Sequence, residues 1–181
     1  MAKLLNEYKD QIVNIKDMEI RRCIQHLLVK SPKWYFTVDN KLFQKNTIKV
    51  MNVAKRIKNK FNLTDKEFDI CISAIFLADT CYYSGTDEIW RDTDVIKDHA
   101  KYVRKYFIKK CPVETAHLNT IGVFDSICTC ILNHETRIGS EPLDKLSMFV
   151  NMSFFISTLE EVSVKTIDFE DLVAPEAQLF T

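Results

Sequence analysis

Glycine and proline are scarce in this chain, with 3 Gly and 4 Pro among 181 residues. An all-β sandwich or barrel needs such residues for the tight turns at its strand ends, so the sequence disfavours that architecture. Apolar residues make up 46% of the chain and charged residues 28%, which is typical of a globular domain and excludes a disordered or collagen-like chain. We therefore expect an all-α fold with one core.

The sequence also lacks long apolar runs and paired cysteines. No run approaches the roughly 18 apolar residues of a membrane-spanning helix, and charges appear too early for a signal-peptide core. The six cysteines contain no C-x-x-C pair, the spacing that zinc-finger sites need. We expect reduced, mostly buried thiols, a cytoplasmic location and no membrane association.

The formal charge of zero, from 25 basic and 25 acidic residues, hides an uneven distribution. Residues 1–60 contain 14 Lys or Arg against 5 Asp or Glu, a net +9, whereas residues 160–181 have a net −5. This polarity suits a polyanion or an acidic protein partner at one end, although solvated helix faces are the more common explanation for any single stretch. Because no nucleic-acid-binding motif accompanies the basic residues, we do not expect nucleic acid to be the partner.

Apolar residues at helical spacing predict about seven helices in a single domain. The predicted helices cover 3–15, 18–30, 46–61, 65–79, 93–110, 113–133 and 142–159. Thr64 and Glu67 have the spacing of a capping box, and Ser140 with Pro142 is typical of a helix start. The aromatic stretch 33–40 has no helical period and is interpreted as a connector packed on the domain.

Three ionisable side chains occupy positions where the helical period requires an apolar residue: Asp79, His99 and His134. Burying such groups is costly unless they are paired, hydrogen-bonded or bound to a metal ion. A single inward histidine is usually a hydrogen-bonded core residue, but two histidines and one aspartate can hold a divalent metal ion. The spacing leaves both interpretations open. His26 is expected to face water, and His117 is ambiguous.

Several motifs occur in the order found in a known enzyme family. They are Trp34-Tyr35-Phe36, Asn46-Thr47, the stretch 75–81, Asp98-His99-Ala100, Asn133-His134-Glu135 and the stretch 145–151. Over residues 31–160 the chain resembles the HD-domain metal-dependent phosphohydrolases, and most closely the small HD-domain proteins of bacteriophages. The resemblance implies an HD-like helical domain at 31–160, preceded by N-terminal helices at 1–30 and followed by an acidic tail at 161–181.

The resemblance also indicates which metal ligands are lost. The first histidine of the family falls on Asn46, the histidine of the His-Asp pair on Ala78, and the late aspartate on about Phe154. An amide offers only a weak neutral oxygen, and alanine and phenylalanine offer no donor. One of the family's two metal ions is therefore expected to be absent.

The other ligand set is complete in Asp79, His99 and His134. The resemblance thus implies one divalent metal ion, which can be Mn, Fe, Co, Ni or Zn, with Asp79 as the retained catalytic residue. Loss of an ion removes transition-state stabilisation from phosphoester hydrolysis. This favours a viral pseudoenzyme in the host cytoplasm that binds a host protein or a nucleotide with little or no hydrolysis. The alternative is a single-metal phosphohydrolase acting on a nucleotide or another phosphomonoester.

Overall fold

The structure, a computed structural model, describes residues 8–32, 35, 42–81, 99–136 and 143–162. These residues form helices and turns without any strand, which confirms the predicted all-α fold. Two short 3-10 helices, η2 (Lys58–Phe61) and η3 (Ala78–Cys81), extend α4 and α5. The α-helices of this part of the chain are α2 (Met18–Val29), α4 (Leu42–Ile57), α5 (Asp65–Leu77), α7 (His99–Lys110), α8 (Pro112–Thr120), α9 (Phe124–Asn133) and α10 (Lys145–Val162).

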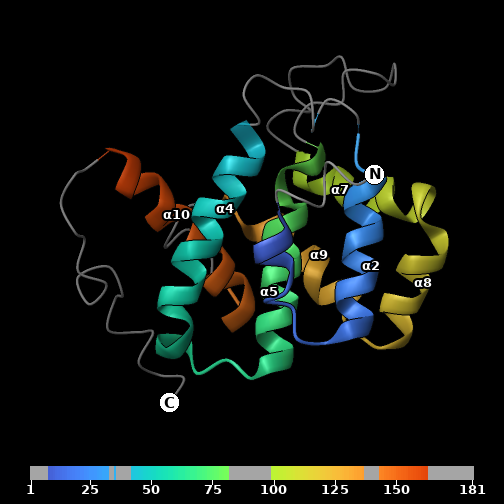
Figure 1. The fold of residues 1–181 in the computed structure, drawn as a ribbon, viewed down its shortest axis with the longest axis horizontal. Coiled ribbons are helices and arrows are strands. Elements are labelled where there is room, and N and C mark those ends of the chain that lie inside the picture. Colours follow the sequence, from blue (N-terminus) through green and yellow to red (C-terminus); the bar gives the residue numbers. More distant parts are fainter. Residues whose placement is uncertain (1–7, 33–34, 36–41, 82–98, 137–142, 163–181) are drawn as a thin grey trace.

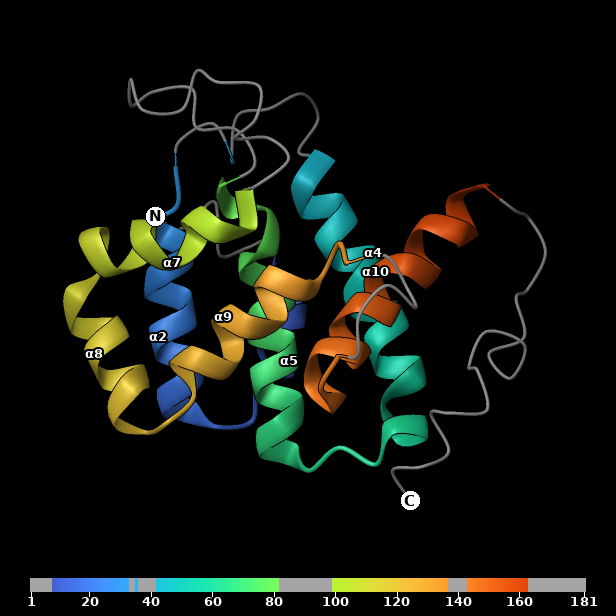
Figure 2. The same ribbon diagram turned by 180° about the vertical axis from the view of Figure 1, so that it is seen from behind.

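Helix α5 runs through the middle of the bundle, with α2 and α8 on one side and α4 and α10 on the other (Figure 1). Seen from behind, α9 crosses over α5 (Figure 2). Every residue from Phe68 to Leu77 is buried. A helix that is buried all round must be covered on every side, and α5 contacts α2, α4, α9 and α10.

Aromatic rings join the two sides of the bundle. The ring of Phe149 in α10 packs edge-on against Phe61 and Phe68, with centroids 5.3 Å and 6.0 Å apart. Tyr8 packs edge-on against Phe76 of α5 at 5.2 Å. Such edge-to-face pairs stabilise a core beyond the area that they bury. The segment before α2 is thereby part of the same core as α5 and α10.

The predicted capping box is confirmed at the start of α5. The Thr64 hydroxyl accepts a hydrogen bond from the Glu67 amide at 3.2 Å, and the Glu67 carboxylate accepts one from the Thr64 amide at 2.8 Å. Two backbone donors that the first helical turn cannot satisfy are thus paired. The box defines the N-terminus of the helix that leads to Asp79.

The prediction of one helix over 113–133 is wrong, because the chain turns at Gly122 and forms α8 and α9. Gly122 adopts a φ of 73°, the left-handed region that glycine favours. Its amide donates to the Asn119 carbonyl, and the Val123 amide donates to the Leu118 carbonyl, both at 3.0 Å. These two bonds form a Schellman motif, which ends α8 and lets α9 leave in a new direction.

Other predicted helix ends also differ. The last helix begins at Lys145 rather than at 142, because the Asp144 carboxylate accepts from the amides of Leu146 and Ser147, each at 3.0 Å. Asp144 thus caps α10, whereas the proposed cap at 140 and Pro142 lie outside the described residues. Helix α4 begins at Leu42 rather than at 46.

The N-terminal part of the chain is described only in part. The predicted helix 3–15 ends at Ile12, where the chain enters turns. Of the connector 33–40, only Tyr35 is described, and it is buried. The start of the helix predicted at 93–110 and most of the tail 161–181 lie outside the described residues.

A buried carboxylate anchors the turn before α2 to the central helix. Asp69 of α5 is 1% exposed, and its two oxygens accept hydrogen bonds from the amides of Lys16 at 2.8 Å and Asp17 at 2.7 Å. Asp17 in turn caps α2 by accepting from the amides of Glu19 and Ile20. The position of α2 therefore depends on a carboxylate that the local sequence pattern does not single out.

We expect Asp69→Asn to lower the free energy of unfolding by about 2 kcal/mol, because the amide group can accept from only one of the two backbone donors. Urea denaturation measures this change. The matched control is Asp65→Asn, which neutralises an exposed carboxylate on the same helix and should have a much smaller effect. Equal losses for the two variants would contradict the anchoring role of Asp69.

All six cysteines are free thiols, and all but Cys128 are buried. Burial raises the pKa of the Cys81 thiol, which is 1% exposed, to about 12. The thiolate is the reactive form, so this group is protected from alkylation. Within the described residues, no helix combines the length and the apolar composition that crossing a membrane requires.

At pH 8 we expect iodoacetamide to modify Cys81 in the native protein about a thousandfold more slowly than in the urea-unfolded chain, because burial suppresses the thiolate. Peptide mass spectrometry after timed quenching measures the two rates. Comparable rates in the native and unfolded chains would show that η3, which ends at Cys81, is accessible to solvent.

Candidate metal centre

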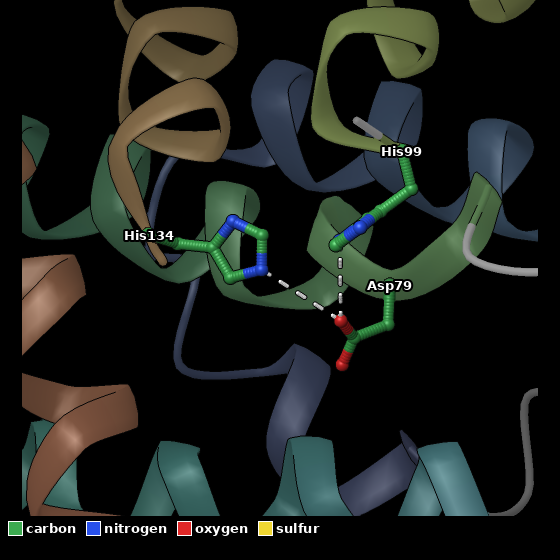
Figure 3. Close-up of side chains that lie close together, drawn as sticks. All are labelled: Asp79, His99 and His134. Carbon is green, nitrogen blue, oxygen red and sulfur yellow. Dashed lines mark ion pairs between the residues drawn. The ribbon is translucent and has the colours of Figure 1, made fainter. Parts of the chain in front are cut away.

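Three ionisable side chains meet where the ends of three helices converge. Asp79 lies in η3, directly after α5; His99 is the first residue of α7; and His134 follows the last residue of α9. Figure 3 shows the three side chains pointing toward one another from these separate elements. The structure thus brings together the three residues that the helical spacing singles out.

The donor atoms of this cluster are close enough to share one ion. One atom from each of Asp79, His99 and His134 lies within 4.8 Å of the others. The Asp79 Oδ1 atom is 3.8 Å from His99 Nε2 and 3.8 Å from His134 Nε2. The two imidazole side chains are at most 1% exposed, and the Asp79 side chain is 13% exposed. The cluster is therefore buried, with its carboxylate nearest to solvent among the three.

The backbone fixes the orientation of the His134 ring. Its Nδ1 lies 2.6 Å from the Ile131 carbonyl oxygen, and because a carbonyl only accepts, Nδ1 carries the proton and donates. In the neutral ring, Nε2 then presents a lone pair toward Asp79. This Nε2 atom is buried and has no hydrogen-bond partner among the described residues. A ligating histidine typically has this arrangement, in which the second nitrogen donates to a carbonyl.

The charge of Asp79 also acts on the His134 ring. Burial by itself disfavours the imidazolium form, but the nearby Asp79 carboxylate outweighs it and raises the pKa of His134 above its ordinary value. The site therefore attracts a positive charge at His134 Nε2. A proton or a metal ion can supply that charge, and a metal ion must compete with the proton.

The amide of Asn151 holds the end of α9 in place. The two hydrogens of its Nδ2 are shared among the carbonyls of Asn133, His134 and Thr136, at 3.0, 3.2 and 2.8 Å respectively. Asn151 lies on α10 and is 2% exposed. The last carbonyls of a helix have no partner within the helix, so this amide satisfies them from outside. The His134 backbone is thereby fixed to α10.

Of the three positions interpreted as lost ligands, Ala78 and Phe154 have side chains without any donor atom. Ala78 is fully buried beside Asp79, and Asn46 is half-buried on α4. The Phe154 ring packs against the His134 ring, with centroids 4.7 Å apart. An apolar ring therefore covers one side of the histidine.

The other two histidines lie outside the cluster. His26 is exposed, as predicted, and its Nδ1 lies 2.9 Å from a Glu114 carboxylate oxygen. His117, which the sequence left ambiguous, is also exposed and pairs with Glu19 at 3.4 Å. Both pairs join α2 to α8.

The residue set fits a divalent ion of the transition series. Imidazole nitrogen suits Zn, Cu, Fe and Ni, and one carboxylate adds the negative charge that a cation needs. In a tetrahedral shell with metal–ligand bonds near 2.0 Å, neighbouring donors lie about 3.3 Å apart. The two 3.8 Å spacings to Asp79 require a contraction of about half an ångström, and the donors of the two histidines, which lie within 4.8 Å of each other, require up to about 1.5 Å. A buried Asp/His/His group that can hold a metal ion is therefore present.

Two residues near the cluster were not predicted to have a role. Asn151 ends the stretch 145–151 that the sequence analysis singles out, but nothing in the sequence shows that it contacts α9. Glu135 directly follows His134, and its carboxylate lies 3.8 Å from His134 Nε2 and 3.9 Å from His99 Nδ1. Its acidic character beside a candidate ligand is a signal that sequence analysis can use.

We expect Asn151→Asp to lower the free energy of unfolding by about 2 kcal/mol, because a buried carboxylate replaces the donor and faces carbonyl oxygens. Chemical denaturation measures the loss. Asn52→Asp, an identical change at an exposed position on α4, serves as the control and should be nearly neutral. Native stability in the Asn151 variant would contradict its role in fixing the end of α9.

Comparisons with known proteins give no relative for this chain: no family model matches it, and no curated protein and no solved structure is significantly similar. The assignment of a candidate metal centre therefore rests on the residues and their geometry.

Proposed function

We propose that this chain is a degenerate HD-domain protein that retains one divalent-metal site and acts mainly by binding a host protein or a nucleotide. Hydrolysis is slow or absent in this proposal. The observation that carries it is the contact between Phe154 and His134, with ring centroids 4.7 Å apart. A phenyl ring at this position supplies no donor for a second ion.

Asp79, His99 and His134 would hold the single ion, which would supply a Lewis-acidic centre for an oxygen of a phosphate or carboxylate ligand. The protein would hold two neutral imidazoles and one carboxylate away from water. The hydrogen bond from His134 Nδ1 to the Ile131 carbonyl supports this role, because it directs the Nε2 lone pair into the site.

In this proposal hydrolysis is slow because the metal site has few charged donors. Phosphoryl transfer depends on positioning and on electrostatic stabilisation of the charge that develops on the phosphate. Ala78 provides no ligand next to Asp79, so the described donor set supports one ion and not a pair. The expected result is tight binding without efficient turnover.

The charge along α7, the helix that begins at His99, supports the proposal that the ligand is anionic. Exposed basic residues follow one another along α7, namely Lys101, Arg104, Lys105, Lys109 and Lys110. Clustered positive charge raises the local concentration of a phosphate-bearing nucleotide or an acidic protein segment. Arg104 is partly neutralised by Asp125 at 2.6 Å.

The alternative function is a single-metal phosphohydrolase acting on a nucleotide or another phosphomonoester. The partial exposure of Asp79 favours it, because a substrate can approach the cluster from the carboxylate side. Catalytic metal sites keep a position open for water or substrate, and three protein donors leave at least one.

A single set of assays separates the two functions. We expect the purified full chain, reconstituted in turn with Mn, Fe, Co, Ni and Zn, to retain about one ion per chain. With nucleoside triphosphates and p-nitrophenyl phosphate, its turnover should match that of Asp79→Asn, while nucleotides or a host protein bind at micromolar or lower concentrations.

Metal-dependent turnover that Asp79→Asn abolishes would replace the proposed function with the alternative. Thr80→Ser is the matched control, because it changes the neighbouring residue and keeps the hydroxyl that donates to the Leu77 carbonyl. A chain that retains no metal and binds no nucleotide or protein would contradict both functions.

A further inference from the structure

Within the described residues, the Glu135 carboxylate lies close to both buried imidazoles. Its Oε1 atom lies 3.8 Å from His134 Nε2, and its Oε2 atom lies 3.9 Å from His99 Nδ1. These separations exceed hydrogen-bonding distance, so the carboxylate faces both rings without a direct bond to either. The Glu135 side chain is 55% exposed, whereas the rings are at most 1% exposed.

The spacing of Glu135 from His134 matches that of Asp79, whereas on the His99 ring Glu135 lies near Nδ1 and Asp79 near Nε2. His134 Nε2 lies 3.8 Å from the Glu135 oxygen and 3.8 Å from the Asp79 oxygen. A contraction of about half an ångström would bring either oxygen to the tetrahedral donor spacing from His134 Nε2. An exposed side chain can make this movement by a rotamer change, because little packing opposes it.

A bound divalent ion would attract the Glu135 carboxylate, because the other three ligands do not neutralise its charge. A divalent ion held by two neutral imidazoles and the Asp79 carboxylate keeps a net charge of +1 in a buried place. Such a charge is costly unless it is paired. Among the described residues, Glu135 is the further carboxylate recorded within 4 Å of both rings, and its charge would bring the total to zero.

From this geometry we infer that Glu135 is the fourth metal ligand, so that the resting site is closed by four protein donors. This inference rests on the proposed function, because it assumes the single ion. A site with four protein ligands is typical of structural and binding roles, whereas catalytic sites leave one position open. Exposure of Glu135 also makes it the ligand that an incoming anionic group can displace.

Cobalt(II) tests the inference directly, because its visible absorption reports the number and geometry of its ligands. The full chain is titrated with Co²⁺ in three forms: wild type, Glu135→Gln and Glu135→Asp. We expect Glu135→Gln to weaken Co²⁺ binding at least about tenfold and to change the visible spectrum. Glu135→Asp keeps the charge on a shorter side chain and should bind with intermediate affinity.

Asp125→Asn is the matched control, because it removes one negative charge from an exposed residue of α9, 74% exposed and paired with Arg104. It should bind Co²⁺ as the wild type does and give the same spectrum. Circular dichroism during thermal unfolding verifies that each variant is folded at the titration temperature.

The possible failures are distinguishable. If the wild-type chain binds Co²⁺ and Glu135→Gln binds it equally well with an unchanged spectrum, the fourth-ligand role is wrong and the single-metal site stands. Weaker binding with an unchanged spectrum also overturns the role, because Glu135 then acts from outside the shell. If the wild-type chain itself binds no Co²⁺, the proposed function fails together with this inference.

Discussion

Two imidazoles and one carboxylate must be kept close together and away from water, and much of the described architecture serves this constraint. Asp79 follows the most deeply buried helix, α5, which is covered by α2, α4, α9 and α10. His134 ends α9, where Asn151 of α10 binds the last carbonyls. Burying these ionisable groups would be unfavourable if they stayed unpaired. A bound cation would remove this cost, because the two imidazole lone pairs and the Asp79 carboxylate would then act as its ligands.

The proposed function distinguishes binding from catalysis by the number of metal ions. In that proposal, the positions interpreted as ligands of a second ion hold Asn46, Ala78 and Phe154. Phe154 packs on His134 instead of offering a donor. If Glu135 closes the remaining shell, a ligand reaches the ion only by displacing a carboxylate. The basic face of α7 then matters for attracting that ligand, and not for stabilising a transition state.

The sequence predicts those features that depend on local pattern. The Thr64–Glu67 capping box and the inward direction of Asp79, His99 and His134 follow from spacing along single helices. The break at Gly122 was missed because the apolar period continues across it, although a glycine between two short helices is itself a signal. Asp69 and Asn151 could not be predicted, because their partners lie 52 or 53 and 15 to 18 positions away in the chain. The meeting of three helix ends also could not be predicted from spacing, because it depends on how separate helices pack and not on the pattern within any one helix.

The central claim is that Asp79, His99 and His134 share one divalent ion. Anomalous diffraction from crystals of the full chain grown with Co²⁺, recorded on both sides of the cobalt absorption edge, tests it most directly. The account predicts one strong anomalous peak per chain, about 2.0–2.2 Å from His99 Nε2, His134 Nε2 and an Asp79 oxygen. The peak should be missing in crystals of His134→Gln. A fully occupied crystal form with no peak between these three residues, or with its only peak elsewhere, would contradict the account.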